Sequence, residues 1–462
     1  MREEKIVIHP FESLRVTDYH GQKQINEHLN VVITGQIPFD KKDEYVRLGG
    51  QQTWAQVVAV SQEGEQNLFY GLVDNLMVEV KNSTCTMILK LVSGTILMDQ
   101  QEKARSFQSG TLTYGELLDT CNQGYDNSAR IMTSGKGKSI GQFIMQYKET
   151  DWKFIKRLAS MNQTVVVADC STPGEKYYFG IPNRKVKIEG SLVEYGEEYD
   201  TEEYLKKRGQ GLNISPFDIM SYIWESRDIY ELGDVGIIEG CQQFVWKIES
   251  KMKGNELYHT YYMKPKLGFQ VATLYNIHIS GVTLFGKVIK VKEEKVQIEI
   301  FNDNNRNKSG KCWFTYATVY SSQDGTGWYC MPEIGDKIRL YFPTDKEQDA
   351  YVASACHEAG AALRKKPECK SWRNKEGKEI RLEPGKILLT NNDGTYIEMS
   401  DDEGVRVVSD GSVTIRANES LYISSTSSSI ELSSSKKVVL KQGNTEMSLG
   451  GDLNMRGARI KL

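Results

Sequence analysis

The end of the sequence carries a repeat that few folds can accommodate. From Ile387 onward, two apolar residues flank one polar residue, and a few turn-forming residues rich in Gly, Ser, Asn and Asp follow. The unit recurs about every eight residues, which is typical of short strands separated by tight turns. The apolar doublets are Ile387 and Leu389, Ile397 and Met399, Val405 and Val407, Val413 and Ile415, Leu421 and Ile423, Ile430 and Leu432, Val438 and Leu440, Met447 and Leu449, Leu453 and Met455, and Ile460 and Leu462.

This alternation predicts that both members of a doublet point to one face of a strand, while the residue between them points to water. One chain winding with three strands per coil would form a stub roughly 15 Å tall with two open ends. Three chains winding about one axis would form a prism roughly 40 Å long and would remove the exposed strand edges. We therefore predict an intertwined β-helix in a homotrimer, whose core contains the doublets from Ile397 to Leu449. The Ser-rich stretches would also suit a disordered linker, but the regular doublets argue against one.

Composition narrows the class of protein. The chain has 462 residues and a net charge of −3, so it can bury a large core, and it lacks the basic footprint of a protein that mainly binds nucleic acid. No run of about 18 apolar residues occurs, and the start, MREEKIVIHP, does not resemble a signal peptide. We expect synthesis and assembly in the cytoplasm. The eight cysteines form no CxxC pair, and we predict no metal site and no cofactor.

Residues 277–355 contain strand-like runs separated by turn-prone segments, which predicts a small β-barrel. Within it, the segment MPEIGDKIRLYF resembles the proline-x-x-glycine-acidic motif in the OB-fold of VgrG proteins and contractile-phage needles, with Pro332, Gly335 and Asp336 at the motif positions. In that family the barrel is a collar between a base and a needle. An OB-fold also makes a single-stranded nucleic-acid binder an alternative. Lys and Arg do not cluster among the aromatic residues here, so we expect no nucleic-acid partner.

Residues 1–276 alternate enough to predict a β-rich base of two barrel-like subdomains, with a helical insert at about 110–161. One amphipathic helix should start at a Thr113 cap with Glu116 in the capping-box position, and a second should start at about Asp151. The segment QYKETDWKFIKRL is similar to a motif of VgrG and related tail-hub proteins. The positions that match are Tyr147, Glu149, Asp151, Arg157 and Leu158.

In order along the chain, the resemblance implies a hub (1–276), an OB-fold collar (277–355), a polar linker (356–386) and a needle (387–462). The implied fold is mainly β: tail-hub barrels with short helices, the collar, and a C-terminal trimeric intertwined β-helix. The implied function is that of a structural spike at the tip of the inner tube of a contractile injection system, such as a type VI secretion system or a phage tail. Such a spike delivers effectors or punctures the target envelope.

The resemblance also implies partners. The hub, as a trimeric pseudo-hexameric ring, would seat on an Hcp-like inner tube and on baseplate proteins, with effectors as possible cargo and a transient contact with the target membrane. Contraction would deliver the particle outside the cell or into a target. A PAAR-like tip protein would sit on an apolar platform formed by Leu453, Met455, Ile460 and Leu462, because exposed apolar patches usually mark interfaces.

We predict that the chain is not an enzyme, because it contains none of the common nucleophile, zinc-hydrolase or phosphate-loop motifs. The paired carboxylates Glu149 and Asp151 could do acid-base chemistry in a cleft, but at a helix start they favour the positive end of the helix dipole. A tail-associated cell-wall or polysaccharide hydrolase remains an alternative. It would use carboxylates on the needle surface, such as Glu398, Asp401 or Glu431.

Overall fold

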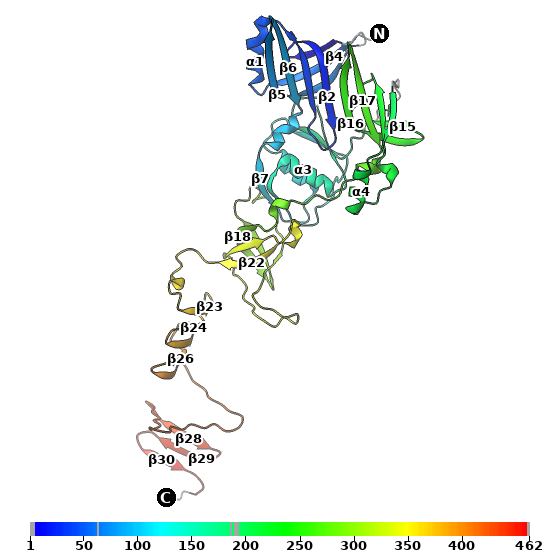
Figure 1. Cartoon of the computed structure of the whole chain (residues 1–462). Coiled ribbons are helices and arrows are strands. Elements are labelled where there is room, and N and C mark those ends of the chain that lie inside the picture. Colours follow the sequence, from blue (N-terminus) through cyan, green and yellow to red (C-terminus); the bar gives the residue numbers. More distant parts are fainter. Residues whose placement is uncertain (1–4, 62–63, 185–186, 189–193, 460–462) are drawn as a thin grey trace. The chain divides into compact units, whose positions relative to one another are not determined.

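The computed structural model describes residues 5–61, 64–184, 187–188 and 194–459 (Figure 1). The chain divides into two compact units, residues 1–357 and 358–462. Strands dominate both units, and the helices are short, as the sequence predicts. Within the described residues, no helix is long and apolar enough to cross a membrane.

The largest sheet of the first unit joins strands from two distant parts of the chain. Its order is β1-β4-β5-β6-β3-β2-β16-β17-β14-β13, and β15 pairs with both β16 and β12. The two strand-rich blocks meet where β2 pairs antiparallel with β16, from Gln24 opposite Lys247 to His20 opposite Lys251. The strands are β1 (Lys5–His9), β2 (Arg15–Gln24), β3 (Asn30–Ile37), β4 (Trp54–Ser61), β5 (Gly64–Lys81), β6 (Thr84–Val92), β12 (Lys187–Ile188), β13 (Glu194–Glu198), β14 (Ser221–Ser226), β15 (Val235–Ile238), β16 (Cys241–Lys253) and β17 (Glu256–Lys264).

Helix α3 and strand β7 lie between this sheet and strands β18 and β22, whereas helix α1 lies beside β5 and β6 at the other end (Figure 1). Two small sheets, β10-β11-β8 and β7-β9, belong to the same unit. The predicted cap of the first inserted helix is confirmed, since Thr113 and Glu116 form a reciprocal capping box. The elements are α1 (Lys42–Gly49), α2 (Tyr114–Asn122), α3 (Asp151–Ser160), α4 (Thr201–Gly209), β7 (Glu102–Phe107), β8 (Ala129–Met132), β9 (Ile144–Thr150), β10 (Val166–Ala168) and β11 (Lys176–Phe179).

The residues predicted as the collar, 277–355, form a five-stranded antiparallel sheet in the order β20-β19-β18-β21-β22. We keep the predicted terms collar for this segment and hub for the residues before it. The inward side chains of the sheet, among them Val288, Ile298, Ile338 and Leu340, are 0% exposed and form a core separate from the core of the hub. The strands are β18 (Thr283–Lys292), β19 (Lys295–Ile300), β20 (Phe314–Thr315), β21 (Lys337–Tyr341) and β22 (Tyr351–Cys356).

The second unit contains two antiparallel meanders, β23-β24-β25-β26-β27 and β28-β29-β30. The first meander begins at Lys370, inside the segment predicted as a linker. Within one chain the strands run back and forth instead of coiling, and residues 409–437, all of which the structure describes, contain no strand. The strands are β23 (Lys370–Arg373), β24 (Glu379–Glu383), β25 (Lys386–Thr390), β26 (Tyr396–Ser400), β27 (Gly404–Val408), β28 (Val438–Gln442), β29 (Thr445–Leu449) and β30 (Leu453–Arg456).

Candidate functional site

The hub motif occupies strand β9 and helix α3, which follow one another directly. The Thr150 side chain accepts a hydrogen bond from the backbone N–H of Lys153, so it caps α3 and fixes the turn from strand to helix. The sequence spacing predicts four apolar residues on one side of this helix: Trp152, Ile155, Leu158 and Ala159. The structure buries Phe154 and Arg157 as well, so α3 is enclosed on most sides and Leu158 is 0% exposed.

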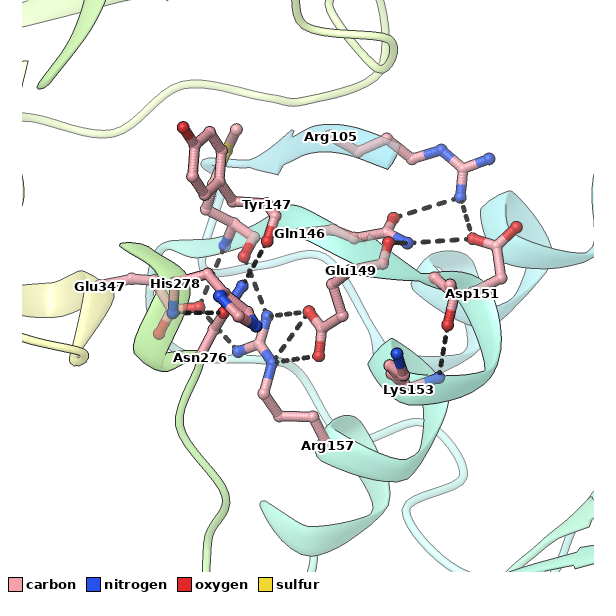
Figure 2. Close-up of polar contacts among 12 residues, drawn as sticks. Arg105, Gln146, Tyr147, Glu149, Asp151, Lys153, Arg157, Asn276, His278 and Glu347 are labelled. Carbon is pink, nitrogen blue, oxygen red and sulfur yellow. Dashed lines mark hydrogen bonds and ion pairs between the residues drawn. The ribbon is translucent and has the colours of Figure 1, made fainter. Parts of the chain in front are cut away.

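Arg157 is the centre of a buried ion-pair cluster between hub and collar (Figure 2). Its Nε and Nη2 atoms donate to the two carboxylate oxygens of Glu149, each at 3.0 Å, and Nη2 also donates to the Met145 carbonyl at 2.9 Å. Its Nη1 atom donates to Glu347 Oε1 of the collar at 2.7 Å. The planar guanidinium suits this forked arrangement, which a lysine could not reproduce. One arginine therefore bridges two carboxylates from different parts of the chain.

Burial raises the pKa of Glu149, and the neighbouring Arg157 opposes that rise. Glu347, on the short 3-10 turn Glu347–Asp349, is 2% exposed. Both carboxylates are thus held out of water and against a cation. This arrangement is typical of a structural ion pair, in which removal of one partner leaves an uncompensated buried charge.

Asp151 makes a second buried cluster on the hub side of the motif. Its Oδ1 atom accepts hydrogen bonds from Arg105 at 2.6 Å and Gln146 at 3.1 Å, and its Oδ2 atom accepts from Lys103 at 2.6 Å and Tyr125 at 2.8 Å. The helix dipole alone does not explain why Glu149 and Asp151 lie at the start of α3, because each carboxylate also binds a cationic side chain directly. Sequence reasoning missed Lys103, Arg105 and Glu347, since they lie far along the chain from the motif.

Strand β9 belongs to both cores of the first unit. Ile144 packs in the hub core, whereas Phe143 and Met145 pack in the collar core. The Phe143 ring meets the Phe314 ring edge-on, with centroids 5.2 Å apart. Tyr147 is half-buried against the same collar core. The motif strand therefore ties the two domains together by packing as well as by charge.

A collar loop completes this junction. Asp303 accepts hydrogen bonds from the backbone N–H of Ser106, at 2.9 Å, and from its hydroxyl, at 2.6 Å. Asn305 donates to the Ser106 carbonyl at 2.9 Å, and the Gln108 backbone N–H donates to the Ser309 carbonyl at 2.6 Å. The loop thus satisfies the open edge of β7, and hub and collar form one continuous structure.

The collar motif forms the turn that precedes β21. Gly335 has a φ of +98°, a conformation that side-chain-bearing residues rarely adopt, which explains the glycine. Its N–H donates to the Val288 carbonyl at 2.9 Å, and the Val288 N–H donates to the Asp336 carbonyl at 2.9 Å. The Asp336 carboxylate accepts from the Glu333 N–H at 2.8 Å. These bonds, with Pro332 at the start of the turn, set the register of β21 against β18.

The second unit carries an exposed apolar face. Cross-strand pairs in the first meander place nine large apolar side chains on one side of the sheet, where each is between 39% and 70% exposed. We call this set the apolar face. Its members are Trp372, Ile380, Leu382, Ile387, Leu389, Ile397, Met399, Val405 and Val407.

The opposite side of the same sheet carries charge. The Arg381 guanidinium donates to Glu379 at 2.7 Å and to Glu383 at 3.2 Å, and Lys386 donates to Glu398 at 2.9 Å. Hydrogen bonding from Arg381 lowers the pKa of Glu379 to about 2. The sheet is therefore amphipathic, with its polar side satisfied within the chain and its apolar side uncovered.

The remaining doublets continue this pattern. In the second meander, Met447 pairs with Leu440 and Met455, and Leu449 pairs with Val438 and Leu453, so these residues share a face. Six further residues lie in the strandless segment 409–437 and are between 51% and 72% exposed. They are Val413, Ile415, Leu421, Ile423, Ile430 and Leu432. Of the expected tip platform, Ile460 and Leu462 lie outside the described residues.

The fold is similar to that of solved injection-machine components. The E. coli protein c3393, described as a component of the type VI secretion system with structural similarity to the T4 bacteriophage tail proteins gp27 and gp5, is 12% identical. Its match covers 76% of this chain and 100% of that chain, with a TM-score of 0.54. A chain of the Francisella PdpA–VgrG complex in its half-lidded form is 9% identical, over 88% of each chain, with a TM-score of 0.57.

The lidded form of the Francisella complex matches 88% of this chain and 80% of that chain at 8% identity, also with a TM-score of 0.57. No protein-family model and no curated protein matches the sequence. The expected fold class is confirmed: the chain is mainly β, and its fold is similar to that of c3393 and of the chain from the PdpA–VgrG complex. The resemblance indicated by the sequence motifs is confirmed at the level of the fold.

Proposed function

We propose that this chain is a non-enzymatic structural spike that acts as a homotrimer at the tip of the inner tube of a contractile injection system. The observation that carries the proposal is the apolar face of the second unit. Monomeric soluble proteins rarely expose a contiguous apolar surface of this kind. Nine large side chains on a sheet whose other side is already satisfied need a covering surface of matching pattern, and two further copies of the same sheet supply it.

The strandless segment supports the same conclusion. Residues 409–437 keep the aliphatic doublets, yet within one chain they have no strand to pair with. Exposed apolar residues are costly, and a segment that buries them must also find hydrogen-bond partners for its backbone groups. Three chains wound about one axis would satisfy both needs, because each strand would then lie between strands of the other two copies. Association would therefore be part of folding in this segment.

The hub–collar junction fits the mechanical part of this role. A spike at the tip of a driven tube must transmit compressive load from its base to its point. The buried Arg157 cluster, the shared strand β9 and the Asp303 loop connect hub to collar through three independent sets of contacts. Close-packed interiors deform little under load.

The motif carboxylates argue against catalysis at the hub motif. Glu149 and Asp151 are 7% and 0% exposed, and both are committed to cations of the same chain. A catalytic carboxylate must reach its substrate. These two side chains have no such access: Glu149 serves the junction, and Asp151 joins segments of the hub.

Partners follow from this proposal. The hub would seat on an Hcp-like inner tube and on baseplate proteins, effectors would travel with the spike, and the needle would cross the target membrane on contraction. A PAAR-like tip protein would dock at the end of the needle, near Leu453 and Met455. Binding of the tip protein to the full chain and to a chain lacking residues Arg459 to Leu462 tests this docking, and unchanged binding would remove Ile460 and Leu462 from the interface.

The decisive experiment is a mass and shape measurement on the purified full chain. Light scattering should report three times the chain mass of 52.4 kDa, and negative-stain imaging should show an elongated particle. A compact monomer in both measurements would overturn the proposal. A compact monomer that hydrolyses cell-wall material would instead favour the hydrolase alternative.

A further inference from the structure

Hub and collar are connected by a short segment that borders two hollows. We call residues 271–276 the connecting segment; it belongs to no helix or strand. Thr273 and Tyr275 line one hollow, of about 310 Å³. Ala272 and Leu274 line the other, of about 260 Å³. Side chains that alternate between two sides in this way are typical of an extended chain, so a partner laid along the segment would meet both hollows.

The backbone of the connecting segment is held to α3 at one residue and open at the residues on either side of it. The Leu274 N–H donates to the Ser160 hydroxyl at 2.8 Å. Within the described residues, the backbone groups of Thr273 and Tyr275 form no hydrogen bond. An extended chain with open backbone groups can bind a second extended chain through main-chain hydrogen bonds, while pockets for alternate side chains provide specificity.

Lysine side chains are in excess around the two hollows. Five lysines and two glutamates are the charged residues that line them. Both glutamates are already bonded to cations of the chain. Glu347 is bonded to Arg157 at 2.7 Å, and Glu203 is bonded to Lys207 at 2.7 Å. The hollows therefore carry a surplus of positive charge from Lys138, Lys156, Lys206, Lys207 and Lys346.

Three of these lysines form no ion pair within the described part of the chain, and two of the three lie over tyrosine rings. Lys138 Nζ is 5.9 Å from the centre of the Tyr114 ring, and Lys346 Nζ is 5.6 Å from the centre of the Tyr275 ring. The third is Lys206 on α4. Cations that lie over rings, and apart from carboxylates of their own chain, suit the acidic groups of a partner.

We infer that the connecting segment binds an extended segment of a different protein, in which acidic residues are interspersed with apolar ones. The acidic side chains would meet the unpaired lysines, and the apolar side chains would enter the hollows against Ile140, Met161 and Leu274. Backbone groups of the partner would bond to those of Thr273 and Tyr275. This inference goes beyond the proposed spike and needs only one copy of the chain, because every residue of the site lies in that copy.

The occupant is a different protein because the acidic residues of this chain are used elsewhere. In residues 194–203, six of ten residues are acidic. This run is folded into β13, which pairs with β14, and into the start of α4, where Glu203 also bonds to Lys264 at 3.0 Å. It is therefore not free to extend along the connecting segment of another copy.

Fluorescence anisotropy with a labelled synthetic peptide and the purified full chain tests the inference. In the probe, pairs of aspartates alternate with pairs of leucines, so each side of the extended peptide carries both kinds of residue. A peptide of the same length with lysine in place of aspartate is the control. We expect saturable binding of the acidic probe, at least about tenfold tighter than that of the basic peptide. Basic peptide that binds as tightly, or no binding of either peptide, would overturn the inference.

Reversing the charge of the two lysines over the rings should weaken binding of the probe. Lys138→Glu combined with Lys346→Glu changes exposed side chains, so the fold should persist, which near-UV circular dichroism checks. We expect a loss of affinity of at least about tenfold. Lys290→Glu combined with Lys292→Glu makes the same change in net charge on β18 and should leave binding unchanged. An equal loss in the two variants would show attraction to the whole surface and would contradict this site.

Hydrogen–deuterium exchange measures the backbone contact separately. The bound acidic probe should slow exchange of the Thr273 and Tyr275 amides, which are open in the chain alone. A probe with the same side chains but an N-methylated backbone should bind more weakly and give no protection. Equal affinity for the two probes would reduce the contact to side-chain charge and overturn the pairing of extended chains.

The outcomes distinguish this inference from the spike proposal. A trimer that does not bind the probe overturns this inference alone, and a monomer that binds it overturns the spike proposal alone. Val407→Asp combined with Ile415→Asp, which should prevent trimer formation, gives a further comparison. Binding by this variant but not by the trimer would show that a neighbouring copy occupies the site, which overturns the assignment to a different protein.

Discussion

Two five-stranded antiparallel sheets in the described part of the chain share the same period-two pattern, but the apolar side is buried in one sheet and exposed in the other. In the collar, inward residues such as Val288 and Leu340 are 0% exposed. In the first meander of the second unit, the corresponding residues Ile397 and Val405 are 39% and 70% exposed. The alternation determines which side of a strand is apolar, and the rest of the chain decides whether anything covers that side.

The two units also differ in where their charged residues lie. Arg157, Glu149, Glu347 and Asp151 are all buried in the first unit. The first three hold hub and collar together, and Asp151 joins segments of the hub. In the second unit, Arg381 and its partners form a ladder on the outer side of a single sheet. In the first unit, a single chain both pairs the charged side chains and buries the apolar ones. In the second unit, a single chain pairs the charged side chains and leaves the apolar ones exposed.

The largest expected effect comes from placing charge at one residue of the apolar face and at one doublet residue of the strandless segment 409–437. Val407→Asp with Ile415→Asp should prevent trimer formation, because buried unpaired carboxylates would cost several kcal/mol in each copy. Light scattering should then report single-chain mass, while the near-UV circular dichroism of the first unit stays unchanged. The matched control, Arg406→Asp with Thr414→Asp, changes the neighbouring residues and should leave the trimer intact. Trimer mass in the first variant would show that this face is not the interface.

The second-largest effect should come from removing the positive charge of Arg157 from the first unit. Arg157→Met leaves Glu149 and Glu347 buried without a partner, which typically costs about 3–5 kcal/mol. Chemical denaturation monitored by tryptophan fluorescence should show the loss. Lys156→Met, one residue away and bound to Glu27 only at 3.4 Å, should cost about 1 kcal/mol or less. Equal losses in the two variants would contradict a special role for the junction.

Mild acid should weaken the first unit through His259. Burial lowers the pKa of this side chain to about 3, so the folded state holds it neutral where the unfolded state, at about 6.5, is protonated. This contribution to the free energy of unfolding is therefore complete above about pH 6.5 and is lost as the pH falls toward 3. By pH 5 the free energy of unfolding should be lower by about 2 kcal/mol. Unfolding measured at pH 7.5 and pH 5 should show this difference, and His259→Gln should reduce it. His20→Gln, at an exposed position, should not change the dependence.

Stronger acid should act on the second unit through Glu379, with the smallest effect. Because its pKa is lowered to about 2 from an ordinary value of about 4.3, its stabilisation is present above about pH 4.3 and is lost as the pH falls toward 2. Chemical denaturation near pH 3 should show the free energy of unfolding of the second unit lowered by about 1 kcal/mol. Glu379→Gln should remove this dependence, whereas Glu403→Gln, in an exposed pair with Arg406, should retain it.

Local patterns were sufficient for much of the fold. The capping box at Thr113 and Glu116 was predictable because a cap depends on residues three positions apart. The collar turn at Gly335 was predictable for a similar reason, since a positive φ favours glycine. Helices α1 and α4 were not predicted, because both are short and neither has a continuous apolar stripe that would mark it in the sequence.

By itself, the sequence determined the strand periodicity, the caps and turns, and which face of each strand is apolar, because all of these depend on neighbours within a few residues. Only the tertiary structure decided that Arg157 meets Glu347, that Asp303 holds Ser106, and that β2 pairs with β16. These contacts join segments far apart in the chain, and they form where burial of the surrounding apolar surface brings charges and backbone groups together so that each one finds a partner. Local sequence patterns do not identify which distant residue will form such a contact.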